Sequence, residues 1–313
     1  MKVYFLLFVT IMYVRCETAH TICIPFECNE MGQIYLPLVI NGTEIIGVFD
    51  SGSPYSVIGD TLSTKVKMVL SSLLDYGYFP FLYDDTISLK VSKSVFFHVR
   101  NLRSESKIAF RIIPNSNNFA LWGNDIIDQY NWFFDYNTML VTISNKPIDI
   151  NVQNSIKIAY ENKLNPLRKT CTLFLPKEIQ LGSDFDIFNN LYQDHIAISD
   201  VLLDSGYHGY TKVGDKIFSY CLMIVNDAMY GKLIVNGEYK QNCVLVPTNG
   251  DSYVFNHITG KGNPVFNGVI NISEDYNFLK KIGVNGILPL GKNEFYSGMY
   301  LDTKNHVVYL LNK

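Results

Sequence analysis

The feature that most constrains this chain of 313 residues is a short motif that occurs twice. Asp50-Ser51-Gly52 follows the apolar pair Val48-Phe49, and Asp204-Ser205-Gly206 follows Leu202-Leu203. Three further landmarks recur in the same order, which are Ile34–Pro37 with Leu173–Pro176, Val57–Asp60 with Lys212–Asp215, and Ala120–Gly123 with Leu288–Gly291. Paired landmarks in one order indicate a diverged internal duplication, and they predict two similar halves.

The chain reads as strands rather than helices. It contains 21 Tyr and 20 Phe residues, and its apolar runs are short and end at Gly, Pro, Asn or Asp. Such runs predict β-strands, while helical periodicity is confined to short pieces such as Asp125–Phe133. The predicted fold is all-β and consists of two similar halves, with Trp122 and Trp132 in the core. The predicted divisions are residues 17–148 for the first lobe, 149–170 for a linker and 171–313 for the second lobe.

The first residues resemble a targeting segment. Lys2 supplies a positive start and Val3–Val14 is an apolar run too short to span a bilayer. We therefore expect residues 1–16 to be a signal peptide cleaved near Cys16 and Glu17, although a buried N-terminal strand is the alternative. The mature protein is expected to be soluble and secreted or lumenal, including endolysosomal compartments. Only residues 17–33 precede the first predicted strand, so no long inhibitory prosegment is expected.

Five cysteines remain after the predicted cleavage, and an odd number leaves at least one thiol free or paired with another chain. Local disulfides between Cys23 and Cys28 and between Cys221 and Cys243 are candidates in an oxidising compartment. Asn41-Gly42-Thr43 and Asn271-Ile272-Ser273 are glycosylation sequons, so a glycoprotein is expected if the chain is exported.

The repeated Asp-Ser-Gly motif carries the chemistry. A single copy is best interpreted as a surface turn, because all three residue types favour turns. Two copies behind apolar strands predict that Asp50 and Asp204 meet where the halves join. Gly52 and Gly206 would allow close backbone approach, and Ser51 and Ser205 would lock the loops together. Two adjacent carboxylates share one proton, so one can act as a base toward water while the other acts as an acid.

These motifs resemble those of the pepsin-type aspartic proteases, a bilobal family with one catalytic aspartate from each lobe. Val48-Phe49-Asp50-Ser51-Gly52-Ser53 matches the family's first motif, and Leu202-Leu203-Asp204-Ser205-Gly206 matches the second. Leu121-Trp122-Gly123 and Leu288–Gly291 occupy the places of the family's apolar-Gly segments, and the resemblance covers nearly the whole mature chain. It implies a bilobal all-β fold with two homologous barrel-like lobes, in which Asp50 and Asp204 form the catalytic dyad in the cleft between the lobes. It also implies that the dyad is supported by Ser51, Gly52, Ser53, Ser205 and Gly206, and that the substrate is an extended polypeptide.

The chain also departs from the family pattern. Tyr207 stands where the family has a small or hydroxyl residue. The first lobe is short and is similar in size to the single-lobe retroviral-type proteases. On that comparison the flap that closes over substrate is expected near Leu74–Asp84, with Tyr76, Gly77 and Tyr78 as candidate substrate-binding residues.

Other functions have weaker support. The six histidines form no His-Glu-x-x-His zinc motif, Gly-x-Ser-x-Gly is absent, and His208 is interpreted as a loop residue. With 26 basic against 29 acidic residues the chain lacks the basic excess of a nucleic-acid binder. We expect a monomeric aspartic endopeptidase without metal or cofactor, and without a membrane partner after signal cleavage. The alternatives are a catalytically silent secreted glycoprotein of the same fold that binds peptide or protein, and a structural protein whose motifs are only turns.

Overall fold

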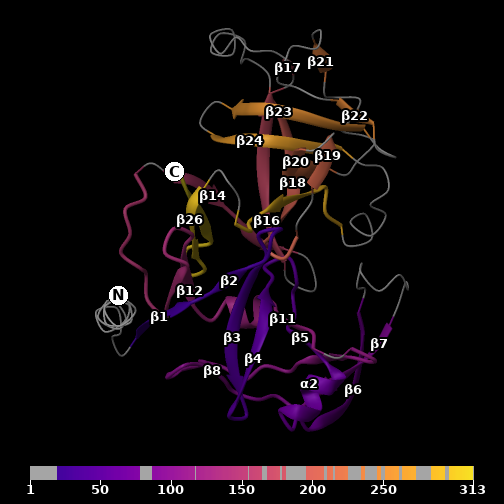
Figure 1. Ribbon diagram of the computed structural model, residues 1–313, viewed down its shortest axis with the longest axis vertical. Coiled ribbons are helices and arrows are strands. Elements are labelled where there is room, and N and C mark those ends of the chain that lie inside the picture. Colours follow the sequence, from indigo (N-terminus) through magenta and orange to yellow (C-terminus); the bar gives the residue numbers. More distant parts are fainter. Residues whose placement is uncertain are drawn as a thin grey trace.

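The computed structural model describes residues 20–77, 87–116, 118–153, 155–163, 168–176, 178–180, 195–207, 210–213, 216–224, 234–236, 245–247, 251–260, 263–272, 283–292 and 296–312. Strands predominate throughout these segments, which confirms the all-β prediction. Most of them form three large sheets (Figure 1). The predicted signal peptide, Tyr78, His208 and Cys243 lie outside the described residues.

The first sheet joins the two halves of the chain. Its neighbours all pair antiparallel, and each half supplies three adjacent strands. At the seam Phe134 of β12 lies opposite Met299 of β26. In spatial order the strands are β1 (Thr21–Pro25), β13 (Leu140–Ser144), β12 (Asn131–Asp135), β26 (Tyr296–Asp302), β27 (Val307–Asn312) and β14 (Ser155–Ala159).

The second sheet contains ten strands and belongs to the first half. β3 shows the alternating burial expected of a strand with one face on the core. In order the strands are β6 (Leu70–Gly77), β7 (Ile87–Ser92), β10 (Arg111–Ile113), β5 (Val57–Gly59), β11 (Ala120–Trp122), β4 (Thr43–Phe49), β3 (Ile34–Ile40), β8 (Phe97–Val99) and β9 (Leu102–Arg103), with β2 (Glu27–Cys28) paired to β3.

The third sheet contains nine strands from the second half. Its main path runs β15 (Glu161–Lys163), β16 (Arg168–Pro176), β18 (His195–Asp204), β25 (Gly286–Pro289), β20 (Lys216–Ile224), β24 (Asn263–Ile272), β23 (Asp251–Gly260) and β22 (Leu245–Pro247). β19 (Tyr210–Val213) pairs with β20, and β17 (Glu178–Gln180) pairs with β21 (Ile234–Asn236) in a separate small sheet.

The two halves repeat one local plan around their aspartates. β4 leads to Asp50 with β11 parallel on one side and β3 antiparallel on the other, while β18 leads to Asp204 between β25 and β16. The pairing corrects one of the repeat landmarks. Tyr35 lies opposite Val48, whereas Thr170 lies opposite Leu202, so Leu173–Pro176 is displaced along its strand relative to Ile34–Pro37.

Two short helices are described, α2 (Asp60–Lys65) and α3 (Asn124–Ile127). The helical prediction for Asp125–Phe133 is therefore wrong beyond Ile127. The Trp132-Phe133-Phe134 run instead pairs with β13 and β26. Apolar residues that fit a helix stripe fit a central strand equally well in so short a run, and the neighbouring strands determine the outcome.

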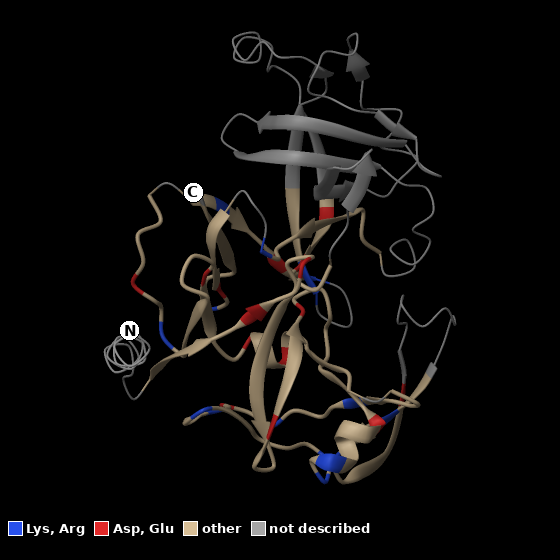
Figure 2. Cartoon of the chain, in the orientation of Figure 1, with Lys and Arg blue, Asp and Glu red and all other residues tan. Residues whose placement is uncertain are grey.

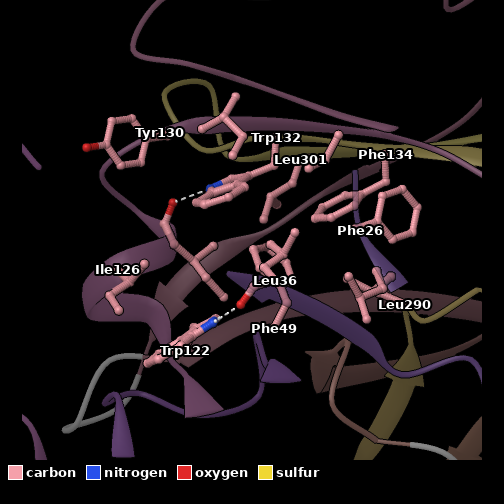
Figure 3. Packing of buried hydrophobic residues seen from close by; sticks show 14 of the residues in the cluster. Phe26, Leu36, Phe49, Trp122, Ile126, Tyr130, Trp132, Phe134, Leu290 and Leu301 are labelled. Carbon is pink, nitrogen blue, oxygen red and sulfur yellow. Dashed lines mark hydrogen bonds between the residues drawn. The ribbon is translucent and has the colours of Figure 1, made fainter. Parts of the chain in front are cut away.

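The hydrophobic core is rich in aromatic side chains, among them Phe49, Trp122, Trp132 and Phe134 (Figure 3). Phe49, which precedes Asp50, packs edge-to-face at ring-centroid distances of 5.0 Å from both Trp132 and Phe134. Trp122 and Trp132 are buried as predicted, and their indole N–H groups donate to the carbonyl oxygens of Leu36 and Ile127 at 2.9 and 2.8 Å. The main chain that leads to Asp50 is therefore anchored by the packing of Phe49 in the aromatic core.

No disulfide joins Cys23 and Cys28, so the predicted bridge between them is wrong. The chain passes from one sheet to another between them, because β1 pairs with β13 while β2 pairs with β3. Cys171 is a free thiol. Residues 149–170, predicted as a linker, include β14, β15 and the start of β16.

Basic and acidic residues are interspersed along the described chain (Figure 2), in keeping with the near-neutral charge. Among the described residues no helix is long and apolar enough to cross a membrane.

Candidate active site

The first aspartate loop begins where β4 ends. Asp50 Oδ1 accepts hydrogen bonds from the backbone N–H groups of Gly52 at 2.9 Å and Ser53 at 3.1 Å. The backbone N–H of Asp50 donates to the Trp122 carbonyl at 3.0 Å, which ties the loop to β11. These contacts fix both the main chain and the carboxyl orientation of Asp50.

The second loop repeats this arrangement at the end of β18. Asp204 Oδ1 accepts from the N–H groups of Gly206 and Tyr207, both at 2.8 Å. The Leu290 N–H donates to the Asp204 carbonyl at 2.9 Å, which ties this loop to the segment after β25. Tyr207 thus supplies from its backbone the same hydrogen bond that Ser53 supplies in the first loop. The departure from the small residue at this position leaves that bond intact.

The carboxyl group of each aspartate lies against the glycine of the opposite loop. A Cβ atom added to Gly52 would lie 2.3 Å from Asp204 Cγ, and one added to Gly206 would lie 2.4 Å from Asp50 Cγ. Separations this short are impossible for real side-chain atoms, so only glycine permits the approach. The structure therefore brings together the two aspartates that the duplication predicted to meet.

Ser51 and Ser205 cross-link the loops through four buried hydrogen bonds. Ser51 Oγ donates to the Leu203 carbonyl at 2.9 Å and accepts from the Ser205 N–H at 3.0 Å. Ser205 Oγ donates to the Phe49 carbonyl at 2.9 Å and accepts from the Ser51 N–H at 2.9 Å. Both serines are fully buried, so every donor and acceptor in the set depends on its partner in the other half.

The aspartates are electrostatically coupled. Burial raises the pKa of Asp50 well above its usual range, and the Asp204 carboxylate and a hydrogen bond to it raise this pKa further. The N–H groups of Gly52 and Ser53 oppose the shift because they stabilise the ionised form. A pair in this environment retains a proton at pH values where an isolated aspartate has lost it.

A second buried carboxyl supports the first loop. Asp125 Oδ1 accepts from the N–H of Ser56 at 2.9 Å and from its hydroxyl at 2.5 Å, and Ser56 Oγ accepts from the Gly123 N–H at 3.0 Å. Asp125 Oδ2 is buried without a hydrogen-bond partner among the residues described. Burial raises the pKa of Asp125 to about 6, against the lowering effect of Ser56 and of the Arg111 charge.

Of the candidate flap near Leu74–Asp84, the structure describes only Leu74–Gly77, at the end of β6, which pairs antiparallel with β7. Tyr76 and Gly77 lie in β6, opposite Ser88 and Ile87. β6 is linked to β10 because Arg111 Nε donates to Asp75 Oδ2 at 3.0 Å. The Arg111 guanidinium also stacks 3.4 Å from the Tyr55 ring centroid. Arg111 therefore links β6 to the segment that follows the first aspartate loop.

Several supporting residues were not singled out from the sequence. Asn124 Nδ2 donates to the Ser51 carbonyl at 3.0 Å, and Asn124 Oδ1 accepts from Lys169 Nζ at 2.6 Å. Gln33 Nε2 donates to the Gly206 carbonyl at 2.7 Å. The position of Asn124 directly after Leu121-Trp122-Gly123 was an available signal, whereas Lys169 and Gln33 have no local signature. No group of three or more His, Cys, Asp or Glu side chains in the described segments is placed to hold a metal ion.

Comparisons with known proteins add little to this geometry. The chain matches no protein-family model and no curated protein sequence. A solved structure similar to part of it is a retropepsin-like aspartic protease from Rickettsia conorii, with 13% sequence identity and a TM-score of 0.30 over 41% of this chain and 94% of that chain. The all-β architecture, with two aspartate loops facing each other between paired strands, is consistent with an aspartic-protease-like β fold.

Proposed function

We propose that this protein is an aspartic endopeptidase, with Asp50 and Asp204 as its catalytic pair. The observation that carries the proposal is the mutual approach of the two carboxyl groups, each packed against the glycine of the other loop. Burial and coupling keep a proton on the pair, and this is the ionisation state that two-carboxylate hydrolysis needs.

The arrangement supports a complete hydrolytic cycle. The ionised carboxyl removes a proton from a water molecule as its oxygen attacks the scissile carbonyl carbon. The protonated carboxyl donates its proton to the carbonyl oxygen, which gives a tetrahedral diol. The proton then held by the first carboxyl passes to the amide nitrogen and the C–N bond breaks. A diol hydroxyl returns its proton to the pair, so the products are a carboxylic acid and an amine and the dyad is restored.

The proposed substrate is an extended polypeptide. An extended peptide can form main-chain hydrogen bonds to a strand, while pockets read its alternate side chains. β6, which pairs with β7, is the candidate strand to which the peptide would bind. Tyr76, Gly77 and Tyr78 are the candidate substrate contacts. Ser53 and the loop glycines and serines serve to hold the dyad.

The test is cleavage of a denatured protein from acid to neutral pH by the wild-type chain and by Asp50→Asn and Asp204→Asn. Each variant should lose at least a thousand-fold in rate, because neither remaining carboxyl can supply both proton transfers (on the order of 10³ for a catalytic group). Asp149→Asn, at an exposed position, is the matched control and should cleave at the wild-type rate. Activity retained in either dyad variant would refute the assignment. Tight peptide binding without cleavage by the wild type would favour a silent binding protein of the same fold.

Export through the secretory pathway belongs to the same proposal. It predicts removal of residues 1–16 and glycan attachment at Asn41, which lies in the exposed turn between β3 and β4. Mass spectrometry of the secreted protein before and after glycosidase treatment checks both. An unprocessed N-terminus and an unmodified Asn41 would contradict this part of the proposal without affecting the dyad.

A further inference from the structure

The first aspartate loop is held from the opposite half of the chain by a relay of side chains. Ser51, next to Asp50, accepts at its carbonyl from Asn124 Nδ2 at 3.0 Å, and Asn124 Oδ1 accepts from Lys169 Nζ at 2.6 Å. Lys169 belongs to β16, whose residue Thr170 pairs with Leu202 two positions before Asp204. The strand beside Asp204 therefore supports the loop of Asp50.

Lys169 occupies an unusual environment for its type. Its side chain has 0% exposure, it forms a short ion pair with Asp128, and its ammonium lies 5.7 Å from the ring centroid of Tyr160. The Asp128 side chain is 36% exposed, so Lys169 could pair with Asp128 without burying its own ammonium group. Burying an ammonium is unfavourable unless it gains further partners, and the contact with Asn124 accounts for the buried position.

The second aspartate loop has a corresponding support from the first half. Gln33 Nε2 donates to the Gly206 carbonyl at 2.7 Å. Gln33 is itself fixed by Asn29, whose side chain donates to Gln33 Oε1 at 2.8 Å and accepts from the Gln33 N–H at 3.0 Å. The adjacent Gly32 carbonyl accepts from the Lys292 N–H at 2.8 Å, so the segment Asn29–Gln33 is also bonded to the second half.

The two supports occupy nearly equivalent places in the duplicated plan. Tyr35 lies opposite Val48 as Thr170 lies opposite Leu202, and these partners precede Asp50 and Asp204 by two residues each. By this register residue 169 corresponds to residue 34, one position from Gln33. Gln33, just before β3, therefore donates directly to the loop of Asp204, whereas Lys169 in β16 reaches the loop of Asp50 through Asn124.

We propose that Lys169 and Gln33 are reciprocal positioning residues of the dyad, each fixing the aspartate loop of the opposite half so that its N–H groups stay aimed at the carboxylate. This inference rests on the proposed function for its catalytic meaning. Lys169 acts through Asn124 on Ser51, and hence on the Gly52 and Ser53 N–H groups. Gln33 acts on Gly206 and hence on the Gly206 and Tyr207 N–H groups.

Amide hydrogen exchange tests the positioning without any need for activity. Lys169→Met should accelerate exchange at Gly52 and Ser53 by about ten-fold or more and leave Gly206 and Tyr207 within about two-fold of wild type. Gln33→Leu should produce the opposite pattern. Lys157→Met, at an exposed lysine of β14, is the matched control and should change neither pair. The inference is overturned if, in both test variants, exchange is accelerated equally at the Gly52–Ser53 and the Gly206–Tyr207 amides. It is also overturned if exchange is accelerated at neither pair of amides in either variant.

The pH dependence of activity supplies a second readout, because a smaller amount of folded protein lowers the rate at every pH but does not shift the profile along the pH axis. The Gly52 and Ser53 N–H bonds lower the pKa of Asp50, so their weakening should raise it. The acid limb of the kcat/KM profile of Lys169→Met should therefore shift to higher pH by about half a unit or more, with kcat reduced and KM little changed. A profile that only scales in height would show a merely structural role and overturn the positioning assignment.

Asn124→Leu covers the case in which Lys169→Met does not fold. It removes the amide relay while Lys169 keeps Asp128, and it should reproduce the Gly52 and Ser53 exchange pattern; an unchanged pattern overturns the relay. If wild-type protein fails to cleave but the crossed exchange pattern holds, the proposed function fails and the positioning stands. If wild-type protein cleaves but the exchange and the pH profile do not change in the variants, the function stands and the positioning fails.

Discussion

Asp125 makes the stability of this protein depend on pH in a way that one substitution should remove. Its carboxyl accepts two hydrogen bonds from Ser56 at one oxygen and has no described partner at the other. Burial raises its pKa from 3.8 to about 6. A raised pKa in the folded state means that the stabilising contribution is fully present below about pH 3.8 and is lost as the pH rises through about 6.

The magnitude follows from the shift. A change of about 2 pKa units corresponds to about 3 kcal/mol, most of which should be lost between about pH 4 and about pH 7. Asn at this position can accept the same two hydrogen bonds from Ser56 but does not titrate. The difference in unfolding free energy between Asp125→Asn and wild type should therefore move in favour of the variant by about 2 kcal/mol across that range.

The assay is urea denaturation at closely spaced pH values, followed by intrinsic tryptophan fluorescence. Taking the difference between the two proteins cancels the contribution of the dyad and of other shared groups. Ser56→Ala gives an independent check on the sign, because it removes a hydrogen bond that lowers the pKa of Asp125 and should move the transition to higher pH. A difference between Asp125→Asn and wild type that stays constant within about 0.5 kcal/mol over this range would refute the reasoning.

Three further predictions concern the loops themselves. Ser51→Ala and Ser205→Ala should each cost about 2–5 kcal/mol of unfolding free energy, since each leaves two buried backbone groups unpaired, and the double variant should cost less than the sum in a denaturation cycle. Gly206→Ala should abolish cleavage in a peptide assay while keeping the strand signal in circular dichroism, because its methyl carbon would lie 2.4 Å from Asp50 Cγ; wild-type activity in this variant would contradict the close approach. Asp204→Asn should lower the pKa of Asp50, since it removes a neighbouring negative charge, and carbon-13 NMR of the carboxyl group would measure the change; an unmoved titration would mean that the two groups are not coupled.

The meeting of Asp50 and Asp204 was predictable because the duplication places the same motif at the end of equivalent apolar strands. The roles of Ser51, Ser205 and the two loop glycines in the geometry followed from the same pattern. These residues lie next to the aspartates, so short sequence windows contain the information. Tyr207 shows the limit of that reasoning, because it departs from the family pattern and yet its backbone N–H makes the bond that the Ser53 N–H makes in the first loop.

The supports of the loops were not predictable in the same way. Lys169 and Asn124 are 45 positions apart, and Gln33 and Gly206 are 173 positions apart, so no local pattern connects them. The predicted bridge between Cys23 and Cys28 failed for the opposite reason. Closeness in sequence suggested a contact, but the chain changes sheets between the two residues.

The first sheet, which joins the two halves, has a consequence for how the chain could be divided. Its order places β1, β13 and β12 from one half beside β26, β27 and β14 from the other, with a single seam between β12 and β26. Produced as separate polypeptides, residues 17–148 and 149–313 would each expose a row of unpaired main-chain groups along that seam. When mixed, the two fragments should therefore pair through β12 and β26 and restore the fold with one break in the chain. Either fragment alone should tend to self-associate through its exposed strand.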